Sequence, residues 1–401
     1  MNVIFVGSIY PTGKIDELKA MGSSVDFAAE TFQNSLLQGL CKYYPELKVI
    51  TAPNISAYPK VEKLFFGKDM FLLSFSGVKH LFTGFCNLPG LKHVSKCLRV
   101  RRAIKQSLVK GKENVVIIYG VHSPFLLALC GIKKNRFTSC LIVPDLPEFM
   151  SGKTNRLYLL GKKVDSWFIR KGLKNVDSYV LFSAYMKERI QIGNNTPWTQ
   201  VEGIYCNEVQ LGQIEKESTK TILYTGGLSK RYGIMDLVEA FSCIEDDNYR
   251  LWICGGGDAL EEIKQWQLKD DRVQYLGLLS KTEVRALQKR ATLLINPRHS
   301  TDEYTKYSFP SKTMEYMASG TPTLMAHLAS IPQEYESHLF FFDDESIEGM
   351  KNKIIEVCEK SQSELETFGK AASKFILEEK NEMRQAKKIV DLINSLKYKC
   401  N

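Results

Sequence analysis

Strand-length apolar runs alternate with helical patterns along this chain, and the alternation restarts once near its middle. The first block has strand-like runs at 2–7, 47–53, 114–120, 139–144, 178–183 and 199–205, and a helical pattern at 27–40. The second block has strand-like runs at 221–227, 250–257, 273–279, 292–297 and 321–326, and a helical pattern around 234–241. Such alternation predicts parallel sheets with helices on both faces. We therefore expect an α/β protein with two Rossmann-like, doubly wound parallel-sheet domains that face a cleft.

A polar stretch at 207–220 separates the two blocks and is typical of a linker. It predicts an N-terminal domain over 1–206 and a C-terminal domain over 207–380. A length of 401 residues accommodates both, at about 150 residues for each domain. The last segment, 381–401, carries an apolar stripe with helical spacing, so we expect a helix that packs across the domains.

The net charge of +9 is concentrated in the first block. The segment 92–112 contains eight Lys or Arg and no acid, and the segment 153–174 interleaves basic with aromatic residues. Basic residues beside exposed aromatics suit an anionic membrane surface. The alternative is a solvated helix face whose aromatics turn into the core, and both interpretations stay open. Nucleic acid is not an expected partner, because no recognition module accompanies the charge.

The sequence gives little sign of secretion or of a membrane span. No apolar run approaches the roughly 18 residues that a spanning helix needs, and the apolar start is too short for a secretory signal. We expect a cytoplasmic protein, peripheral at most to the inner face of the plasma membrane. Ten cysteines lack paired spacing, so neither zinc nor a disulfide framework is expected.

Candidate site residues follow the predicted strands. Open α/β sheets place ligands at the carboxyl ends of their strands. His122 follows the strand at 114–120, and glycines 226, 227 and 255 end two strands of the second block.

The most informative segment is 307–322, YSFPSKTMEYMASGTP, which lies between two predicted strands. Pro310 is typical of a helix start, and the unpaired N–H groups of a helix start bind anions. Lys312 adds a positive charge there. One turn further on, Glu315 is placed to accept hydrogen bonds from two adjacent sugar hydroxyls. The segment thus predicts a phosphate and ribose site.

The runs TILYTGGLSKRYGIMDLVEAF, RLWICGGG, VQYLGLL and YSFPSKTMEYMASGTP, in this order, resemble the donor-binding half of family-4-type retaining glycosyltransferases with the GT-B fold. The resemblance covers residues 220 to about 356. The first half is similar more loosely, through MGSS, the turn at 122–124, and PDLPEF.

The resemblance implies an enzyme of the hexosyltransferase type. It would move a sugar from a nucleotide diphosphate donor, UDP-linked, to the hydroxyl of a glycan, lipid-linked or other acceptor, with retention of configuration. A role in cell-surface polysaccharide or glycoconjugate synthesis follows from the same resemblance. The first domain would be the acceptor side and the second the nucleotide-sugar side. Neither a metal nor a cofactor is expected, since no D-x-D pair is present.

The positions of residues at the predicted strand ends and the resemblance together give three groups of site residues. The catalytic candidates are His122, Lys312 and Arg231. The donor-binding candidates are Gly226, Gly227, Lys230, Tyr307, Ser308, Phe309, Pro310, Ser311, Glu315, Gly255 and Leu278. The loop of Gly22 and Ser23 is expected to approach the leaving phosphate or the acceptor.

The chain departs from the family pattern at three positions. Gly227 and Tyr232 stand where many members have an arginine and a lysine, and Tyr307 replaces the first of two glutamates. A departing diphosphate still requires positive charge. The available cations are Lys230, Arg231, Lys312 and Arg298.

Two other functions stay open, the first of them because of these departures. One is a non-catalytic, glycosyltransferase-like partner subunit. The other is a nucleotide-sugar epimerase on the same two-domain plan. A nicotinamide oxidoreductase is not expected, because neither block opens with the G-x-G-x-x-G fingerprint.

Overall fold

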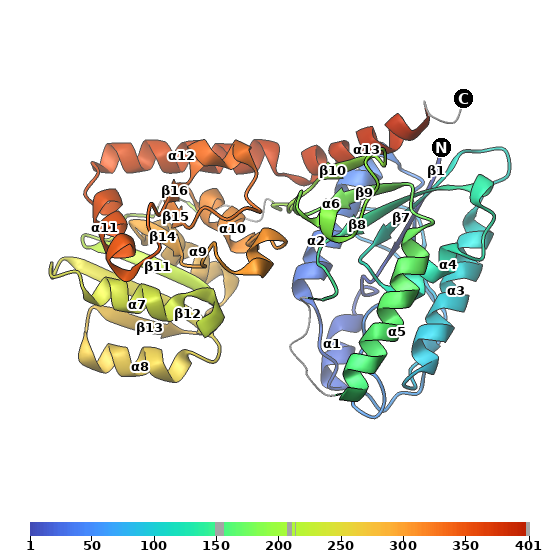
Figure 1. Ribbon diagram of the computed structural model, residues 1–401, viewed down its shortest axis with the longest axis horizontal. Coiled ribbons are helices and arrows are strands. Elements are labelled where there is room, and N and C mark those ends of the chain that lie inside the picture. The colour runs from blue at the N-terminus through green and yellow to red at the C-terminus, as the bar shows by residue number, and fades with distance from the viewer. Residues whose placement is uncertain (149–155, 207–210, 213, 398–401) are drawn as a thin grey trace. The chain divides into compact units, whose positions relative to one another are not determined.

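The computed structural model describes residues 1–148, 156–206, 211–212 and 214–397 (Figure 1). The chain forms two compact units, each with its own sheet and core. The first comprises Met1–Ile204 and Glu382–Asn401, and the second comprises Tyr205–Asn381. Parts of the polar stretch at 207–220, of PDLPEF and of the basic segment 153–174 lie outside the described residues.

The first unit is built on an eight-stranded sheet in the order β10-β9-β8-β7-β1-β2-β5-β4. Its strands are β1 (Asn2–Gly7), β2 (Lys48–Thr51), β4 (Asp69–Phe71), β5 (His80–Phe82), β7 (Asn114–Tyr119), β8 (Thr138–Val143), β9 (Ser178–Leu181) and β10 (Trp198–Gln200). All neighbours are parallel except β4, which is antiparallel to β5. A separate antiparallel pair consists of β3 (Phe65–Phe66) and β6 (Phe85–Cys86).

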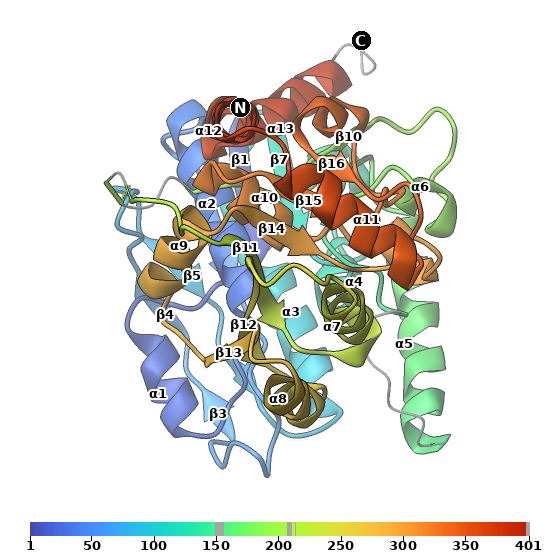
Figure 2. The ribbon, with the colours of Figure 1, turned by 90° about the vertical axis from the view of Figure 1, so that its left-hand side faces the viewer.

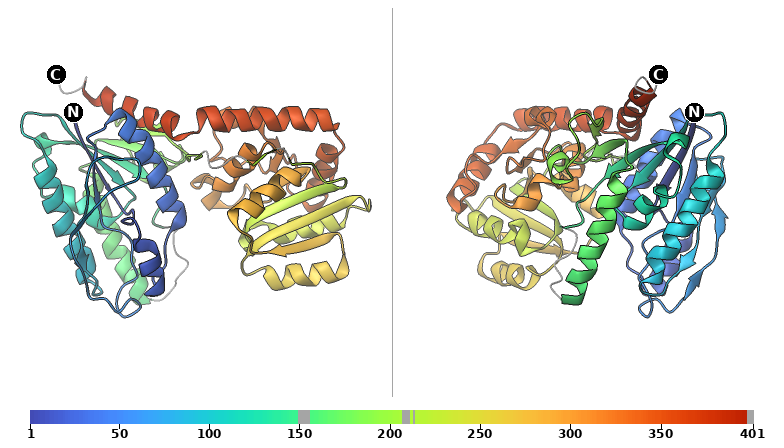
Figure 3. Two further views of the ribbon diagram at one scale, coloured as in Figure 1. Left: turned by 180° about the vertical axis from the view of Figure 1, so that it is seen from behind. Right: turned by 45° about the vertical axis from the view of Figure 1, so that its right-hand side comes forward.

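The helices of the first unit form two layers around this sheet (Figure 3). They are α1 (Lys14–Ala20), α2 (Phe27–Tyr43), α3 (Leu91–Ser107), α4 (Ser123–Leu129), α5 (Arg156–Leu173), α6 (Met186–Arg189), α13 (Glu382–Lys397) and the 3₁₀ turn η1 (Lys134–Arg136). Val3 and Phe5 of β1 share a core with Leu36 of α2 and Ile389 of α13. Helices α3, α4 and α5 lie side by side. The C-terminal helix therefore packs along α2 and completes the core of the first unit.

The second unit has a six-stranded, all-parallel sheet in the order β13-β12-β11-β14-β15-β16 (Figure 2). Its strands are β11 (Lys220–Gly227), β12 (Tyr249–Gly256), β13 (Val273–Gly277), β14 (Leu293–Asn296), β15 (Thr323–Met325) and β16 (Phe340–Phe341). Its helices are α7 (Ile234–Ser242), α8 (Leu260–Lys269), α9 (Lys281–Arg290), α10 (Ser311–Ser319), α11 (Ile347–Cys358) and α12 (Gln362–Glu379), with 3₁₀ turns η2 (Lys230–Tyr232), η3 (Glu303–Lys306) and η4 (Gln333–His338).

The predicted α/β class with doubly wound parallel sheets is confirmed. The run at 199–205 differs, because only its first two residues belong to a strand, β10. The short strands β3 to β6 were not predicted, since each is only two or three residues long and shows no periodicity. No helix within the described ranges is long and apolar enough to cross a membrane.

Candidate functional site

The carboxyl ends of β11 and β12 meet at paired glycines. The parallel register places Gly226 opposite Gly255 and Gly227 opposite Gly256. A Cβ on Gly255 would lie 1.8 Å from the carbonyl oxygen of Gly226, and Gly255 has a φ of +140°. No side chain fits there, so the backbone itself forms the surface at this end of the sheet.

Helix α10 begins at the same end of the sheet. Its N-cap residue, Pro310, provides no side-chain cap, and Gly320 ends the helix in the left-handed conformation. The buried Tyr316 hydroxyl donates to the carbonyl of Thr225 at 2.9 Å and accepts from the Thr225 N–H at 2.7 Å. These bonds fasten α10 to the end of β11.

Not every N–H group in the first turn of α10 is open to a ligand. The Thr313 N–H donates to the carbonyl of Pro310 at 2.8 Å. The N–H groups of Ser311 and Lys312 have no acceptor among the described residues. Two donors at a helix start therefore remain for an anionic ligand.

Lys312 and Glu315 pair with each other across one turn. Their side chains are 42% and 44% exposed, and Nζ lies 2.6 Å from the carboxylate. An exposed pair of this kind contributes about 1 kcal/mol or less. A ligand that offers a phosphate to Lys312 and hydroxyls to Glu315 can therefore separate the pair at small cost.

Two arginines stack on two tyrosines beside these elements. The guanidinium carbon of Arg231 lies 3.8 Å from the ring centroid of Tyr304, and that of Arg298 lies 4.4 Å from the ring centroid of Tyr232. The two tyrosine rings lie 6.4 Å apart. Neither arginine has a carboxylate partner in the part of the chain that the structure describes. The stack therefore holds two uncompensated cations, whose N–H groups remain able to bind an anion.

The third predicted cation of this region, Lys230, is compensated. Its ammonium forms an ion pair with Glu262, and its backbone N–H donates to Asp258 at 3.0 Å. Arg298, which the sequence predicted only as a further cation, is therefore better placed than Lys230 to bind an anion together with Arg231.

His299 fixes the loop between β14 and α10. Its Nε2 lies 2.5 Å from the Asp236 carboxylate and its Nδ1 lies 3.4 Å from that of Glu345. Glu345 also accepts from the N–H of Ser300 at 2.9 Å. Burial lowers the pKa of His299, but the two carboxylates outweigh burial and leave the pKa above its ordinary value.

We expect the stability of the second unit to fall as the pH rises through the folded-state pKa of His299. The folded pKa exceeds the unfolded value of about 6.5, so the contribution is complete below that value and is lost above the folded pKa. Thermal unfolding at a series of pH values should therefore show a slope that His299→Gln flattens. His327→Gln, at an exposed histidine near Glu336, is the control. An unchanged slope in His299→Gln would contradict the assignment.

The other donor candidates of 307–311 differ in their surroundings. Phe309 is buried in the core against Tyr335, at 5.4 Å between ring centroids. The Ser308 carbonyl accepts from the Ser330 hydroxyl at 3.2 Å. Tyr307 follows η3 and is half-buried. Phe309 and Ser308 thus anchor the entry to α10.

Leu278 lies directly after β13. It is 80% exposed, and its Cδ2 lies 3.6 Å from the position that a Cβ on Gly256 would take. An exposed apolar side chain over the end of β12 offers an apolar contact to a planar ring.

In the first unit, His122 follows β7 and is the N-cap residue of α4. Its ring lies so close to Gly120 that a Cβ there would be 2.7 Å from Nε2, and it meets Phe125 edge-on at 5.7 Å. Burial lowers the pKa of His122 to about 4, with a further lowering by the Lys96 charge. The imidazole is therefore neutral at physiological pH.

Gly22 and Ser23 follow α1, and Gly22 has a φ of +79°. The buried Ser23 hydroxyl accepts from the N–H of Ser56 at 3.0 Å. The next helix, α2, is capped by Asp26, which accepts from the Ala29 N–H at 3.0 Å. A carboxylate already occupies that helix start, which disfavours a phosphate there and leaves the acceptor as the better ligand for this loop.

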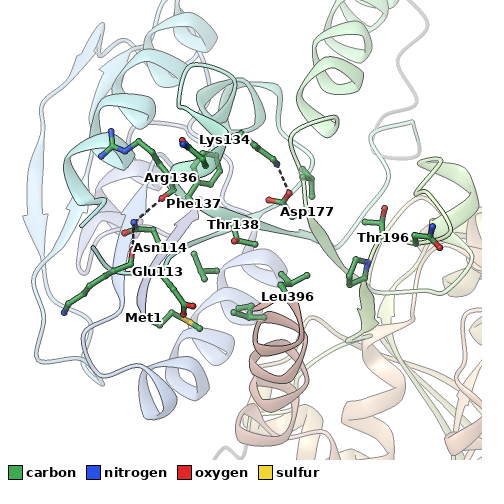
Figure 4. A pocket seen from close by; sticks show the side chains of 17 residues that line it. Met1, Glu113, Asn114, Lys134, Arg136, Phe137, Thr138, Asp177, Thr196 and Leu396 are labelled. Atoms are coloured by element: carbon green, nitrogen blue, oxygen red, sulfur yellow. Dashed lines mark hydrogen bonds and ion pairs between the residues drawn. The ribbon is translucent and has the colours of Figure 1, made fainter. Parts of the chain in front are cut away.

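A cavity of about 910 Å³ lies in the first unit, at the amino ends of β7 and β8 (Figure 4). Its polar groups are largely paired with one another. Lys134 forms an ion pair with Asp177 at 2.8 Å, and Asn114 donates to the carbonyl of Arg136 at 3.1 Å. The cavity lies at the amino ends of the strands, whereas His122 lies at their carboxyl ends. We assign no ligand to it.

Sequence reasoning missed the residues that hold the site together. Tyr304 and Tyr316 were not predicted, and Tyr232 was read only as a missing lysine. The available signal was the tyrosine beside an arginine in the turn after β11. Tyr316 carried no signal, because a tyrosine on the buried face of a helix is indistinguishable from a core residue.

Comparisons with known proteins agree with this architecture. Residues 209–375 match the family described as glycosyl transferases group 1. Sucrose-phosphate synthase from Thermosynechococcus elongatus superposes with a TM-score of 0.62 at 14% identity, over 99% of each chain. Anabaena Alr3699/HepE in complex with UDP superposes with a TM-score of 0.61 at 13% identity, over 98% of this chain and 100% of that one.

A third solved structure, the lipopolysaccharide outer core galactosyltransferase WaaB in its apo form, has a TM-score of 0.60 at 16% identity. The match covers 98% of this chain and 99% of that one. No curated protein sequence matches the chain. At these identities the structural likenesses establish the fold, and the predicted GT-B fold is confirmed.

Proposed function

We propose that this chain, which carries a glycosyl transferases group 1 domain at residues 209–375 and has the GT-B fold, transfers a sugar from a UDP-linked donor to an acceptor hydroxyl with retention of configuration. The observation that carries the proposal is the uncapped start of α10 beside two arginines without carboxylate partners. The UDP bound to the similar Anabaena protein supports the choice of nucleotide.

Each part of the donor has its own place in this proposal. The diphosphate would contact the Ser311 and Lys312 N–H groups and the two arginines, and Glu315 would accept hydrogen bonds from the ribose hydroxyls. The uracil would lie against the exposed side chain of Leu278. This division follows the charges, because the carboxylate is suited to hydroxyls and the cations to phosphate.

The chemical step requires one bond to form and one to break. The bond between the anomeric carbon and the diphosphate oxygen breaks, and the diphosphate leaves with the electron pair. The acceptor oxygen bonds to the same face of the carbon, and its proton passes to the departing phosphate. Arg231, Arg298 and the α10 amides would stabilise the negative charge that develops. His122, a neutral imidazole, would orient a sugar hydroxyl. No step of this scheme requires a metal.

Nucleotide binding tests the proposal. UDP should raise the unfolding temperature of the full chain more than GDP does, since a ligand at about 100 times its dissociation constant stabilises by roughly 2.7 kcal/mol. Glu315→Ala should weaken UDP binding by about tenfold or more, because the ribose hydroxyls lose a charged acceptor. Glu348→Ala, in the similar pair with Lys351 on α11 at 2.7 Å, is the matched control.

Failure of all nucleotides to stabilise the chain would contradict the proposal. UDP binding without transfer to any acceptor would favour the non-catalytic subunit, which Tyr307 and Gly227 keep open. Conversion of the donor alone into an epimer would favour the epimerase.

We also propose that the acceptor belongs to cell-surface polysaccharide or glycoconjugate synthesis and is met at an anionic membrane surface. The solvent-facing side of α3 supports this, because Leu91, Val94 and Leu98 lie exposed along one stripe. On α5, Trp167 is 53% exposed and lies under the Lys171 ammonium at 5.3 Å. The alternative of a solvated helix face whose aromatics turn into the core does not explain why these apolar side chains are exposed.

Co-sedimentation with vesicles tests the membrane proposal. Binding should increase with the fraction of anionic lipid and fall in high salt. Leu98→Glu should weaken it severalfold, because a carboxylate replaces an apolar contact beside the basic residues. Leu268→Glu, at an 80% exposed leucine on α8 of the second unit, should have no effect. Sedimentation that is independent of anionic lipid would remove the proposal.

A further inference from the structure

A second group of basic side chains lies at the carboxyl end of the first sheet, where Lys96 is buried, Lys92 and His122 are half-buried and His93 is exposed. It surrounds a cavity of about 120 Å³ lined by Asn54, Lys92, His93, Lys96, His122, Pro124 and Phe125. The volume is several times the roughly 30 Å³ that a water molecule takes in the liquid. Helix α3 contributes two lysines and a histidine, and the turn after β7 contributes His122. We refer to this cavity as the His122 pocket.

The two lysines of the His122 pocket are held by neutral groups. Lys96 is 5% exposed, and its ammonium donates to the carbonyls of Ala52 and Pro53 at 3.1 and 2.6 Å. The Lys92 ammonium donates to the carbonyl of Ile55. Neither has a carboxylate partner within the described part of the chain. Carbonyl oxygens orient an ammonium but do not cancel its charge, so the pocket retains a positive charge that is partly shielded from water.

The pKa values of the basic groups in the pocket are lowered, because burial there disfavours their charged forms. Burial lowers the pKa of Lys92 to about 8 and that of Lys96 well below its usual range, and the Lys92 charge lowers Lys96 further. Burial also lowers the pKa of both histidines. The carboxylates that act on them are Asp165, on both, and Asp26, on His122, and their effect is smaller than that of burial. A bound anion would reverse these shifts.

The His122 ring has no hydrogen-bond partner among the described residues, and its one ring contact is with Phe125. Its two ring nitrogens are therefore not committed to the protein. An imidazole beside two ammonium groups can hold a small oxyanion by donating one N–H.

We propose that the His122 pocket binds the phosphate group of a phosphorylated acceptor. The pocket has the size for one such group, two cations that reach it from one helix, and an imidazole that completes it. That the phosphate belongs to the acceptor rests on the proposed function, because the donor diphosphate is assigned to the second unit. The anion site itself stands on the cavity and its lining alone.

Nuclear magnetic resonance of the full chain with isotope-labelled histidine tests the site without any activity measurement. Addition of inorganic phosphate should move the His93 and His122 resonances in a saturable way and raise the pKa of His122 by about one unit or more. The resonance of His338, which stacks on Phe375 of the second unit, should not move. Absence of a saturable shift at His122 would overturn the proposal.

Variants identify the groups that bind. Lys92→Gln should weaken phosphate binding by about tenfold or more. His93→Gln should also weaken phosphate binding, but less than Lys92→Gln does. Both avoid the fully buried Lys96, whose loss endangers folding. Lys105→Gln, at an exposed lysine of the same helix, should bind phosphate as the natural chain does. Phosphate binding that is unaffected in Lys92→Gln would also overturn the proposal.

The source of the anion is tested with two further probes. Acetate that moves His122 at lower concentration than phosphate would indicate a carboxylate in place of a phosphate. UDP that competes with phosphate at His122 would mean that the donor diphosphate uses this pocket, which would overturn the assignment to the acceptor. UDP binding that leaves His122 unchanged would support it. Failure of UDP to bind at all would count against the proposed function but not against the pocket.

Discussion

Arg231→Ala and Arg298→Ala are each expected to lower kcat/KM for glycosyl transfer by about 100-fold or more, through loss of a cation that stabilises the leaving diphosphate. Each guanidinium is held over a tyrosine ring, at 3.8 and 4.4 Å. Stacking fixes the plane of the guanidinium and leaves its N–H edge open. The positive charge is therefore oriented before the donor binds, which is the condition under which it acts most strongly in the transition state.

The effect should fall mainly on kcat, because the negative charge on the bridging oxygen grows only as the bond to the sugar breaks. Steady-state kinetics with varied donor concentration separates the two parameters. The double variant should lose less than the product of the single effects, since both arginines belong to one stack and are coupled. Full additivity would mean that the arginines act independently.

Two controls separate the charge from the stack. Tyr304→Phe removes a buried hydroxyl that has no hydrogen-bond partner and keeps the ring, so transfer should be nearly unchanged. Lys269→Ala removes a cation stacked on Trp266 of α8 at 5.2 Å, outside the site, and should leave kcat/KM unchanged. Loss of activity in Lys269→Ala to the same degree would show a general effect of surface charge.

The sequence predicted the frame of this site because its signals are local. Continuous apolar runs located β11, β12 and β14, and Pro310 with Gly320 located both ends of α10. Lys312 and Glu315 followed from the spacing on that helix. These features depend on neighbours within one or two turns, where periodicity and capping rules apply.

The partners of the charged residues could not be predicted in the same way. The Arg231 stack on Tyr304 and the His299 pair with Asp236 join segments that are distant in the sequence. The burial of Lys96 beneath the loop after β2 contradicts the usual exposure of lysine, and only the packing of α3 on that loop reveals it. For Lys230 the sequence predicted a cation available to the donor, because its charge is visible in the sequence. Its ion pair with Glu262 is not visible there.

Gly255→Ala should destabilise the second unit by about 3 kcal/mol or more, the largest effect on stability that we expect from adding a single carbon atom. The new Cβ would lie 1.8 Å from the carbonyl oxygen of Gly226, and the backbone φ of +140° is one that alanine rarely adopts. The carbonyl of Gly226 cannot move aside to relieve this contact, because it belongs to the main chain and not to the end of a flexible side chain. Strands β11 and β12 would have to separate at the end where the donor is proposed to bind.

The neighbouring Gly256→Ala is the matched control. Its Cβ would meet only the side chain of Leu278, at 3.6 Å, which is an ordinary contact. Urea unfolding should therefore give a lower midpoint for Gly255→Ala with a similar m-value, and a midpoint near that of the natural chain for Gly256→Ala. Equal midpoints for the two variants would show that the strands adapt to the added carbon. In that case the close approach of β11 and β12 would not be what forms the backbone surface at the proposed donor site.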